Sequence, residues 1–384
     1  MWRHIASNGL SLLIVGLALL AGLLAWGRAQ YQSPGSLTEA MCLEVESGST
    51  FRDVSENLAA QGAISRPEIF RIGADYEGLT GSLKAGSFII APGASMEEIV
   101  DTVTSSGQST CGTEVVYRIG VAAADVQVRE LDPATGAFGV TAEFDPIAGE
   151  APEVYAEARE DEDTRYRVTL AEGVTSWQVA NALRAADFLE GEIVQVPPEG
   201  SLAPESYEVE PGSARGDVIA RMTELQAARV AAAWEARPEA VPVETPEEAL
   251  ILASIIEKET GVAGEREQVA SVFANRLREG MRLQTDPTVI YGITGGEGLL
   301  GRGLRQSELD RATLYNTYQI AGLPPTPIAN PGLASIEAAL NPAETDYLYF
   351  VADGSGGHAF ASTLEEHNEN VRRWREIEAQ QANQ

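Results

Sequence analysis

The sequence predicts an α+β protein with a single apolar helix at its N-terminus, on the strength of three observations. Residues 10–26 form an apolar run without a charged side chain. A pattern typical of a strand, a turn and a helix occurs in residues 42–112 and recurs in residues 166–240. A strong helix start at Thr245 then opens the last part of the chain, residues 241–384.

The apolar run at residues 10–26 lies between Arg3 and Arg28, which nearly cancel as signals of membrane orientation. At about 1.5 Å per helical residue, the run is only just long enough to cross a bilayer. The alternative is a cleaved signal peptide, but residues 25–27 form a poor cleavage site. We expect a single-pass anchor in the inner (plasma) membrane, with residues 1–9 in the cytoplasm and the rest of the chain on the periplasmic side.

The chain of 384 residues carries a formal net charge of −30, which restricts its partners. Nucleic acids and anionic lipid surfaces would repel this charge, so we expect no nucleic-acid partner. A neutral or mixed-charge polymer, such as a sugar chain, is compatible with it. Only three histidines occur, and HExxH and CxxC motifs are missing, so the sequence predicts neither a metal site nor another cofactor.

Two segments of the chain share one pattern. Val45, Gly48, Thr50, Val54 and Leu58 recur 125 positions later as Leu170, Gly173, Thr175, Val179 and Leu183. Thr50 and Thr175 stand where the N-cap of a helix is expected. The two units resemble LysM-like peptidoglycan-binding modules, and structural spacers are the alternative.

These units set the expected domain organisation. A polar linker, residues 27–41, leads to the first module at residues 42–112, and residues 113–165 look like an insertion of unknown role. Residues 166–240 hold the second unit and a connecting helix. Cys42 and Cys111 flank the first module; an exported compartment permits a disulfide between them, and two free thiols are the alternative.

A buried helix opens the last part of the chain. Thr245 is the expected N-cap, Pro246 occupies the first helical position, and Glu248 completes a capping box. The helix continues through an apolar stretch to Glu259, and Gly261 is the expected terminator.

The two glutamates near the end of this helix are not equivalent. Leu252, Ile255, Ile256 and Glu259 follow the i, i+3, i+4, i+7 spacing, so Glu259 lies on the apolar face, whereas Glu257 does not. Burial and the negative end of the helix dipole both raise the pKa of a carboxyl group. A carboxylic acid that stays protonated near neutral pH is what cleavage of a glycosidic bond needs. The plainer interpretation is a solvated or salt-bridged glutamate.

Several short motifs bear on this choice. They are Glu257-Lys258-Glu259-Thr260, the segment 282–292, Tyr315-Asn316-Thr317-Tyr318, and the segments 322–325, 327–332, 347–351 and 357–360. Together they resemble the MltG-type (YceG-like) endolytic murein transglycosylases, densely from residue 250 to 373. The sequence departs from the family pattern at Thr326, where glycine is usual, and at residues 199–207, a degraded aromatic-rich motif.

This resemblance implies a lysozyme-like α+β catalytic domain in which Glu259 is the catalytic acid. Glu259 would protonate the glycosidic oxygen between N-acetylmuramic acid and N-acetylglucosamine. As a carboxylate it would then take the proton of the muramic acid 6-hydroxyl, which closes a 1,6-anhydro ring. The family acts on the glycan strands of peptidoglycan beside peptidoglycan synthases (penicillin-binding proteins) and sets strand length.

Six further side chains are expected to line the sugar cleft: Gln284, Thr285, Asp286, Asn316, Tyr318 and His358. Some have a second interpretation. Asp286 before Pro287 could be a plain helix N-cap, and Asn316 a turn-stabilising asparagine. A nucleophile pair of Ser355 with His358 is disfavoured because a G-x-S-x-G elbow is missing.

Two other functions compete with the transglycosylase. A hydrolytic muramidase would use water as the nucleophile, and its products would be heavier by one water. A non-catalytic scaffold would bind peptidoglycan through the small modules alone, and its purified catalytic part would cleave nothing.

Overall fold

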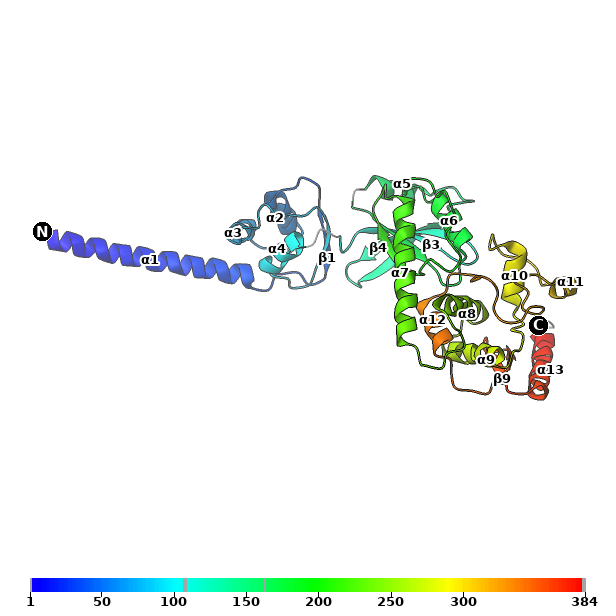
Figure 1. The fold of residues 1–384 in the computed structure, drawn as a ribbon. Helices are drawn as coiled ribbons and strands as arrows, with labels where there is room; N and C mark the ends of the chain where they lie inside the picture. Colours follow the sequence, from blue (N-terminus) through cyan, green and yellow to red (C-terminus); the bar gives the residue numbers. More distant parts are fainter. Residues whose placement is uncertain (1, 106–108, 162, 382–384) are drawn as a thin grey trace. The chain divides into compact units, whose positions relative to one another are not determined.

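The computed structural model describes residues 2–105, 109–161 and 163–381, with side chains described from residue 12 onward. The chain divides into two compact units (Figure 1). Unit 1 comprises Met1–Val115, Val128–Ala142 and Pro152–Arg165, and unit 2 comprises Val116–Gln127, Glu143–Ala151 and Tyr166–Gln384.

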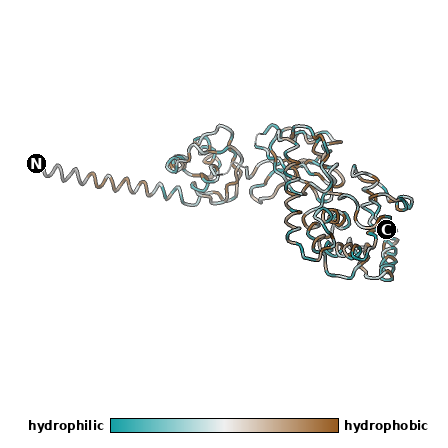
Figure 2. Tube along the Cα trace, viewed as in Figure 1, coloured by the Kyte–Doolittle hydropathy of each residue, from teal (hydrophilic) through white to brown (hydrophobic). Residues whose placement is uncertain are grey.

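A long helix, α1 (Trp2–Gln32), begins the structure and confirms the expected apolar helix. It extends beyond the apolar run at both ends. Its segment Leu12–Gln32 has a mean hydropathy of 2.0 and is long enough to cross a membrane (Figure 2). The leucine side chains along it are exposed, whereas its last turn packs against the first module, where Tyr31 is buried and donates to Glu77 at 3.1 Å.

The first module forms a small α+β core within unit 1. Its elements are β1 (Met41–Val45), α2 (Phe51–Ala60), α3 (Pro67–Tyr76), β2 (Gly86–Ile90) and α4 (Met96–Ser105). β1 and β2 pair antiparallel, with Leu43 opposite Phe88, and both side chains are fully buried. Cys42 and Cys111 form a disulfide, so of the two alternatives left by the sequence the bonded one is present.

A five-stranded sheet follows, in the order β5-β4-β3-β6-β7. Its strands are β3 (Thr113–Ile119), β4 (Ala124–Asp132), β5 (Ala137–Phe144), β6 (Arg165–Leu170) and β7 (Ser206–Val209). Residues 113–165, the expected insertion, therefore supply three strands and the helix α5 (Glu153–Glu160). β6 and β7 pair antiparallel, with Val168 opposite Tyr207.

The repeated pattern corresponds to repeated local structure. Thr50 caps α2 and Thr175 caps α6 (Ser176–Ala185), and each threonine is part of a complete capping box. Gly48 and Gly173 both adopt positive φ in the turn before the cap, a conformation that favours glycine. The connecting helix of the second unit is α7 (Arg215–Ala236).

The last part of the chain is mainly helical around the buried helix α8 (Pro246–Glu259). Its other elements are η1 (Ala263–Glu265), α9 (Arg266–Arg278), α10 (Asp286–Thr294), α11 (Gln306–Leu309), α12 (Leu333–Leu340), β8 (Tyr349–Ala352), β9 (His358–Ala361) and α13 (Leu364–Gln381). The inner faces of α8, α9 and α12 form one apolar core. β8 and β9 form an antiparallel hairpin with Phe350 opposite Phe360.

The expected start of α8 at Thr245 is confirmed, but its capping box and its expected end need correction. Thr245 is the N-cap, but the Glu248 carboxylate accepts from the backbone N–H of Glu244, so the capping box is only half formed. The helix ends at Glu259 with an extended Thr260 as C-cap, and Gly261 has no positive φ. Thr260 ends the helix instead, because its hydroxyl oxygen accepts from the N–H of Val262 and turns the chain locally.

Candidate active site

Glu259 is the last residue of α8, and its half-buried side chain reaches the start of α10. The hydroxyl of Thr285 donates a hydrogen bond to Glu259 Oε1. Burial raises the pKa of the Glu259 carboxyl, and the nearby Asp286 carboxylate adds to this. The Thr285 hydrogen bond, the Arg276 guanidinium and, when it is protonated, the His358 imidazole act in the opposite direction without cancelling the rise. The carboxyl group is therefore biased toward its protonated form.

The two residues before Glu259 bind elsewhere. The Glu257 carboxylate accepts from the backbone N–H of Gly332 at 3.0 Å, just before α12. The Lys258 ammonium donates to the carbonyl of Gly173 at 3.1 Å, in the turn before α6. Glu257 and Lys258 thus fasten two loops to α8, and only Glu259 faces Thr285. This agrees with the separation of the two glutamates by helix face.

Thr285 is held by a network of buried hydroxyl groups. Its backbone N–H donates to Thr317 Oγ1 at 3.0 Å, and its carbonyl accepts from Thr288 Oγ1 at 2.8 Å. The hydroxyls of Thr288 and Thr317 lie 2.9 Å apart and share a hydrogen bond. Since all three threonines are buried, the hydroxyl that meets Glu259 has a fixed position.

Gln284 has a strained backbone beside this network. Its φ of 52° is the only positive value for a non-glycine residue in the described parts of the chain. Such a conformation costs about 1–3 kcal/mol and persists only where neighbouring contacts impose it. The N–H of Gln284 donates to the carbonyl of Thr317 at 3.1 Å, which is one such contact. The side chain is exposed and is free to meet a ligand.

Asp286 is the first residue of α10, and Thr285 occupies the N-cap position. The interpretation of Asp286 as the N-cap is therefore wrong by one residue, because the helical conformation already begins at Asp286. Its exposed carboxylate accepts from the Tyr318 hydroxyl at 2.7 Å. Burial and this hydrogen bond to Asp286 raise the pKa of the Tyr318 hydroxyl, which stays neutral. Asp286 and Tyr318 both lie close enough to Glu259 to interact with it electrostatically.

Asn316 is fully buried, and its side-chain amide is already engaged. The amide nitrogen donates to the carbonyls of Glu308, Leu309 and Arg311, and the amide oxygen accepts from the N–H of Tyr318. This is the arrangement of a turn-stabilising asparagine. Asn316 shapes the loop that carries Thr317 and Tyr318.

His358 begins β9 and contacts Glu265 at the end of η1. Its backbone N–H donates to Glu265 Oε1 at 3.0 Å, and its Nδ1 lies 2.8 Å from Glu265 Oε2. The Ser355 hydroxyl donates to Asp353 rather than to His358, so these two residues form no nucleophile pair. Glu265 was not expected from the sequence, and it lies 93 positions from His358.

Arg276 is a second residue that the sequence did not single out. Its buried guanidinium donates to the carbonyls of Leu283 at 2.6 Å and Leu348 at 2.7 Å. It joins the strand-like segment before Gln284 to the start of β8. The sequence spacing could have identified it, because Arg276 follows Val269 and Phe273 on the apolar face of α9. A charged side chain on such a face needs a specific hydrogen-bond partner.

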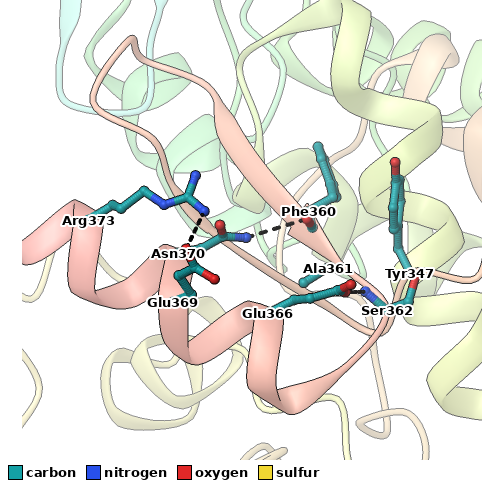
Figure 3. Close-up of a pocket in the computed structure, with 8 residues that line it drawn as sticks. All are labelled: Tyr347, Phe360, Ala361, Ser362, Glu366, Glu369, Asn370 and Arg373. Atoms are coloured by element: carbon teal, nitrogen blue, oxygen red, sulfur yellow. Dashed lines mark hydrogen bonds and ion pairs between the residues drawn. The ribbon is translucent and has the colours of Figure 1, made fainter.

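A pocket of about 330 Å³ lies along β9 and α13 (Figure 3). Its lining residues are Tyr347, Phe360, Ala361, Ser362, Glu366, Glu369, Asn370 and Arg373. The Tyr347 and Phe360 rings stack with centroids 5.3 Å apart, and Phe360 lies 6.3 Å from the ring of His358. The aromatic side of the pocket therefore adjoins His358, which interacts electrostatically with Glu259.

Within residues 2–105, 109–161 and 163–381, no group of three or more His, Cys, Asp or Glu side chains is placed to hold a metal ion. The site instead offers one partly buried carboxylic acid, one exposed carboxylate, hydroxyl groups and an imidazole.

Comparisons with known proteins find a matching family, related sequences and a similar solved structure. The sequence profile of the YceG-like family matches residues 147–373. An endolytic murein transglycosylase of Bacillus subtilis (strain 168) is 48% identical over 119 residues, and one of Streptococcus pneumoniae (strain D39) is 36% identical over 133 residues. The alignments cover 31% and 33% of this chain, and only 32% and 23% of those relatives. A crystal structure of a YceG-like protein from Listeria monocytogenes is similar at 25% identity with a TM-score of 0.46, covering 86% of this chain and 98% of that one.

Proposed function

The chain belongs to the YceG-like family, and from this premise we propose that it is an endolytic murein transglycosylase. It cleaves the bond between N-acetylmuramic acid and N-acetylglucosamine within peptidoglycan strands. The observation that supports this most directly is the Glu259 carboxyl, which burial biases toward the protonated form and Thr285 holds in place. The relatives named for this activity are aligned over part of their length, and the activity of the whole protein is inferred from them.

In the first step, Glu259 gives its proton to the glycosidic oxygen as the bond from that oxygen to C1 breaks. Because Thr285 donates to Oε1, the acidic proton resides on Oε2, and that oxygen faces the substrate. The muramic acid is left as an oxocarbenium-like species, and the resulting Glu259 carboxylate keeps the hydrogen bond from Thr285.

In the second step, the 6-hydroxyl of the same muramic acid attacks C1 and loses its proton to the Glu259 carboxylate. A 1,6-anhydro ring forms, and Glu259 returns to its acidic state. One residue serves as acid and then as base because no water has to be activated. Asp286 is not needed as a nucleophile, since the hydroxyl of the substrate supplies the new bond.

The side chains around Glu259 have separate parts in this proposal. Gln284, Asp286, Tyr318 and His358 contact the glycan, because each is at least partly exposed beside Glu259 or its hydrogen-bond partners. Thr285 does not meet the glycan; its hydroxyl holds the Glu259 carboxyl in place through a hydrogen bond. Asn316 supports the loop of Tyr318 instead of meeting an N-acetyl group, since its amide is already bonded to three carbonyls.

Endolytic cleavage requires the strand to continue on both sides of the broken bond. We place part of that strand in the pocket of Tyr347 and Phe360, which adjoins His358. Its volume of about 330 Å³ falls in the usual range of small ligand sites. Aromatic faces and an amide are suited to stacking on a sugar ring and bonding its hydroxyls.

The remaining parts of the chain place the enzyme at its substrate. Helix α1 is a membrane anchor, the last part adopts a lysozyme-like fold, and the two small units are LysM-like modules that bind peptidoglycan. Peptidoglycan synthases are the expected partners, with limitation of strand length as the outcome. N-terminal sequencing of the mature protein tests the anchor, and a start near Arg28 would show a cleaved signal peptide instead.

Mass spectrometry of digested glycan strands tests the activity. We expect fragments that end in 1,6-anhydro-muramic acid. Fragments heavier by one water would instead show a hydrolytic muramidase. Intact strands that remain bound to the protein would show a non-catalytic scaffold.

A further inference from the structure

Glu265 and His358 form a shielded pair beside the proposed active site. Both oxygens of Glu265 are used: Oε1 accepts from the His358 backbone N–H at 3.0 Å, and Oε2 lies 2.8 Å from Nδ1. Only 17% of the histidine side chain and 19% of the glutamate side chain are exposed. The Phe350 ring meets the imidazole edge-on, with centroids 5.2 Å apart. Backbone, carboxylate and aromatic contacts therefore fix the imidazole together.

The neighbouring Gly357 makes room for this pair. A Cβ atom at position 357 would lie 2.4 Å from Glu265 Oε1 and 3.2 Å from the carboxyl carbon. Real Cβ atoms do not approach other atoms so closely, so any other residue would displace the carboxylate. The glycine before His358 is thus required by the position of Glu265, which gives a physical reason for the Gly-His sequence.

The pairing determines which ring nitrogen carries hydrogen. A carboxylate oxygen only accepts, so Nδ1 must be the protonated nitrogen. In the neutral ring Nε2 then has a free lone pair. No hydrogen bond to Nε2 is found from the described part of the chain, and Nε2 is not among the buried polar atoms that lack a partner. It is therefore open to solvent, on a ring that lies close enough to Glu259 to interact with it electrostatically.

We infer that Glu265 is a positioning residue that holds His358 with Nε2 as a hydrogen-bond acceptor for a donor group of the glycan, either a sugar hydroxyl or the N–H of an N-acetyl group. The inference rests on the proposed function for the identity of the ligand. The geometry of the pair itself does not depend on that function. Glu265 acts only through His358, because both of its oxygens are bonded to that residue.

The state of the ring can be measured directly in the full chain. Only three histidines are present, so ¹⁵N-histidine labelling gives a simple NMR spectrum, with His358→Asn for assignment. We expect His358 to be protonated on Nδ1 and bare on Nε2. Glu265→Ala should move the proton to Nε2, and Glu265→Gln, which retains an acceptor oxygen, should restore the original tautomer. A wild-type ring protonated on Nε2 alone, or no change in Glu265→Ala, would overturn the pairing.

Kinetics test whether the pair serves the substrate. We expect Glu265→Ala and His358→Ala each to raise KM for glycan strands about tenfold, the loss of one or two hydrogen bonds, with a smaller change in kcat. The double variant should be no worse than His358→Ala, since Glu265 has no separate role. Gly357→Ala should resemble Glu265→Ala. The exposed Glu267→Ala, in the first turn of α9, is the control and should match the wild type.

The outcomes separate this inference from the proposed function. Additive losses in the double variant, or full activity of His358→Ala, would overturn the role of the dyad even if strands are cleaved normally. If the wild type cleaves no glycan, the proposed function fails, while the NMR spectra still decide whether Glu265 sets the tautomer of His358.

Discussion

The Thr285 hydroxyl donates to Oε1 of Glu259, although the two residues lie 26 positions apart and on different helices. This hydrogen bond opposes the larger effect of burial on the pKa of the Glu259 carboxyl. It also leaves Oε2 as the oxygen that would carry the acidic proton in the proposed reaction.

Glu259→Gln should abolish strand cleavage, and Glu257→Gln should reduce it only slightly. A glutamine at 259 cannot donate a proton of suitable acidity, and loss of a general acid costs about 10²–10⁴ in rate. A glutamine at 257 can still accept from the N–H of Gly332 through its amide oxygen. Both changes remove one charge from the same helix end, so each controls for the other in an assay of anhydro-muramic acid products. An active Glu259→Gln variant beside an inactive Glu257→Gln variant would refute the assignment.

Thr285→Val should shift the alkaline limb of the pH–rate profile to higher pH. The general acid works only while protonated, so activity falls as pH rises through the pKa of Glu259. The Thr285 hydrogen bond lowers that pKa, and its removal therefore raises it further. The maximal rate should also fall, because the carboxylate formed in the first step loses a donor. Thr285→Ser, which keeps the hydroxyl, should behave like the wild type, and a shift of the limb to lower pH in Thr285→Val would contradict the model of the site.

Glu259→Gln should stabilise the folded protein at high pH. Because the pKa of Glu259 is raised on folding, stability is fully present below the unfolded pKa and is lost as pH rises through the folded one. A glutamine side chain does not titrate, so the variant does not lose folding stability in this pH range. Thermal melts should therefore nearly coincide at low pH and separate in favour of the variant as pH increases. A difference that narrows with rising pH would show that Glu259 is not held in its acidic form.

Arg276→Gln should destabilise the catalytic part by roughly 2–4 kcal/mol, because the buried carbonyls of Leu283 and Leu348 lose a charged donor. Arg278→Gln is the matched control on the same helix, since Arg278 is exposed. Urea unfolding of both variants measures the difference. Equal stability of the two would mean that the guanidinium does not hold the segment before Gln284.

Asn370→Ala combined with Arg373→Ala should raise KM severalfold for long strands and leave the cleavage of short fragments unchanged. Both side chains line the pocket on α13, whereas Glu259 is untouched. Arg372→Ala removes an exposed charge from the same helix outside the pocket and serves as the control. If KM rises equally for short and long substrates, the pocket is not a distal part of the glycan site.

Helix periodicity in the sequence was enough to choose Glu259 over Glu257, because i, i+3, i+4 and i+7 neighbours share a face whatever surrounds the helix. The same local reasoning placed Thr50 and Thr175 as helix caps and identified the apolar N-terminal helix. These features depend on residues within one or two turns of each other. The family resemblance likewise depended on short motifs that can be recognised without the fold.

The tertiary structure decided the partners of these residues. Glu265 and His358 are 93 positions apart in the sequence. The carbonyls that accept from the Asn316 amide are brought together only by the folded loop. The disulfide joins Cys42 to Cys111 across 69 positions. The three strands of residues 113–165 pair in one sheet with β6 and β7. Such contacts depend on how distant segments pack, which no local period in the sequence encodes. The sequence could therefore single out Glu259 as the proposed acid, and only the packed chain could show which residues hold its side chain.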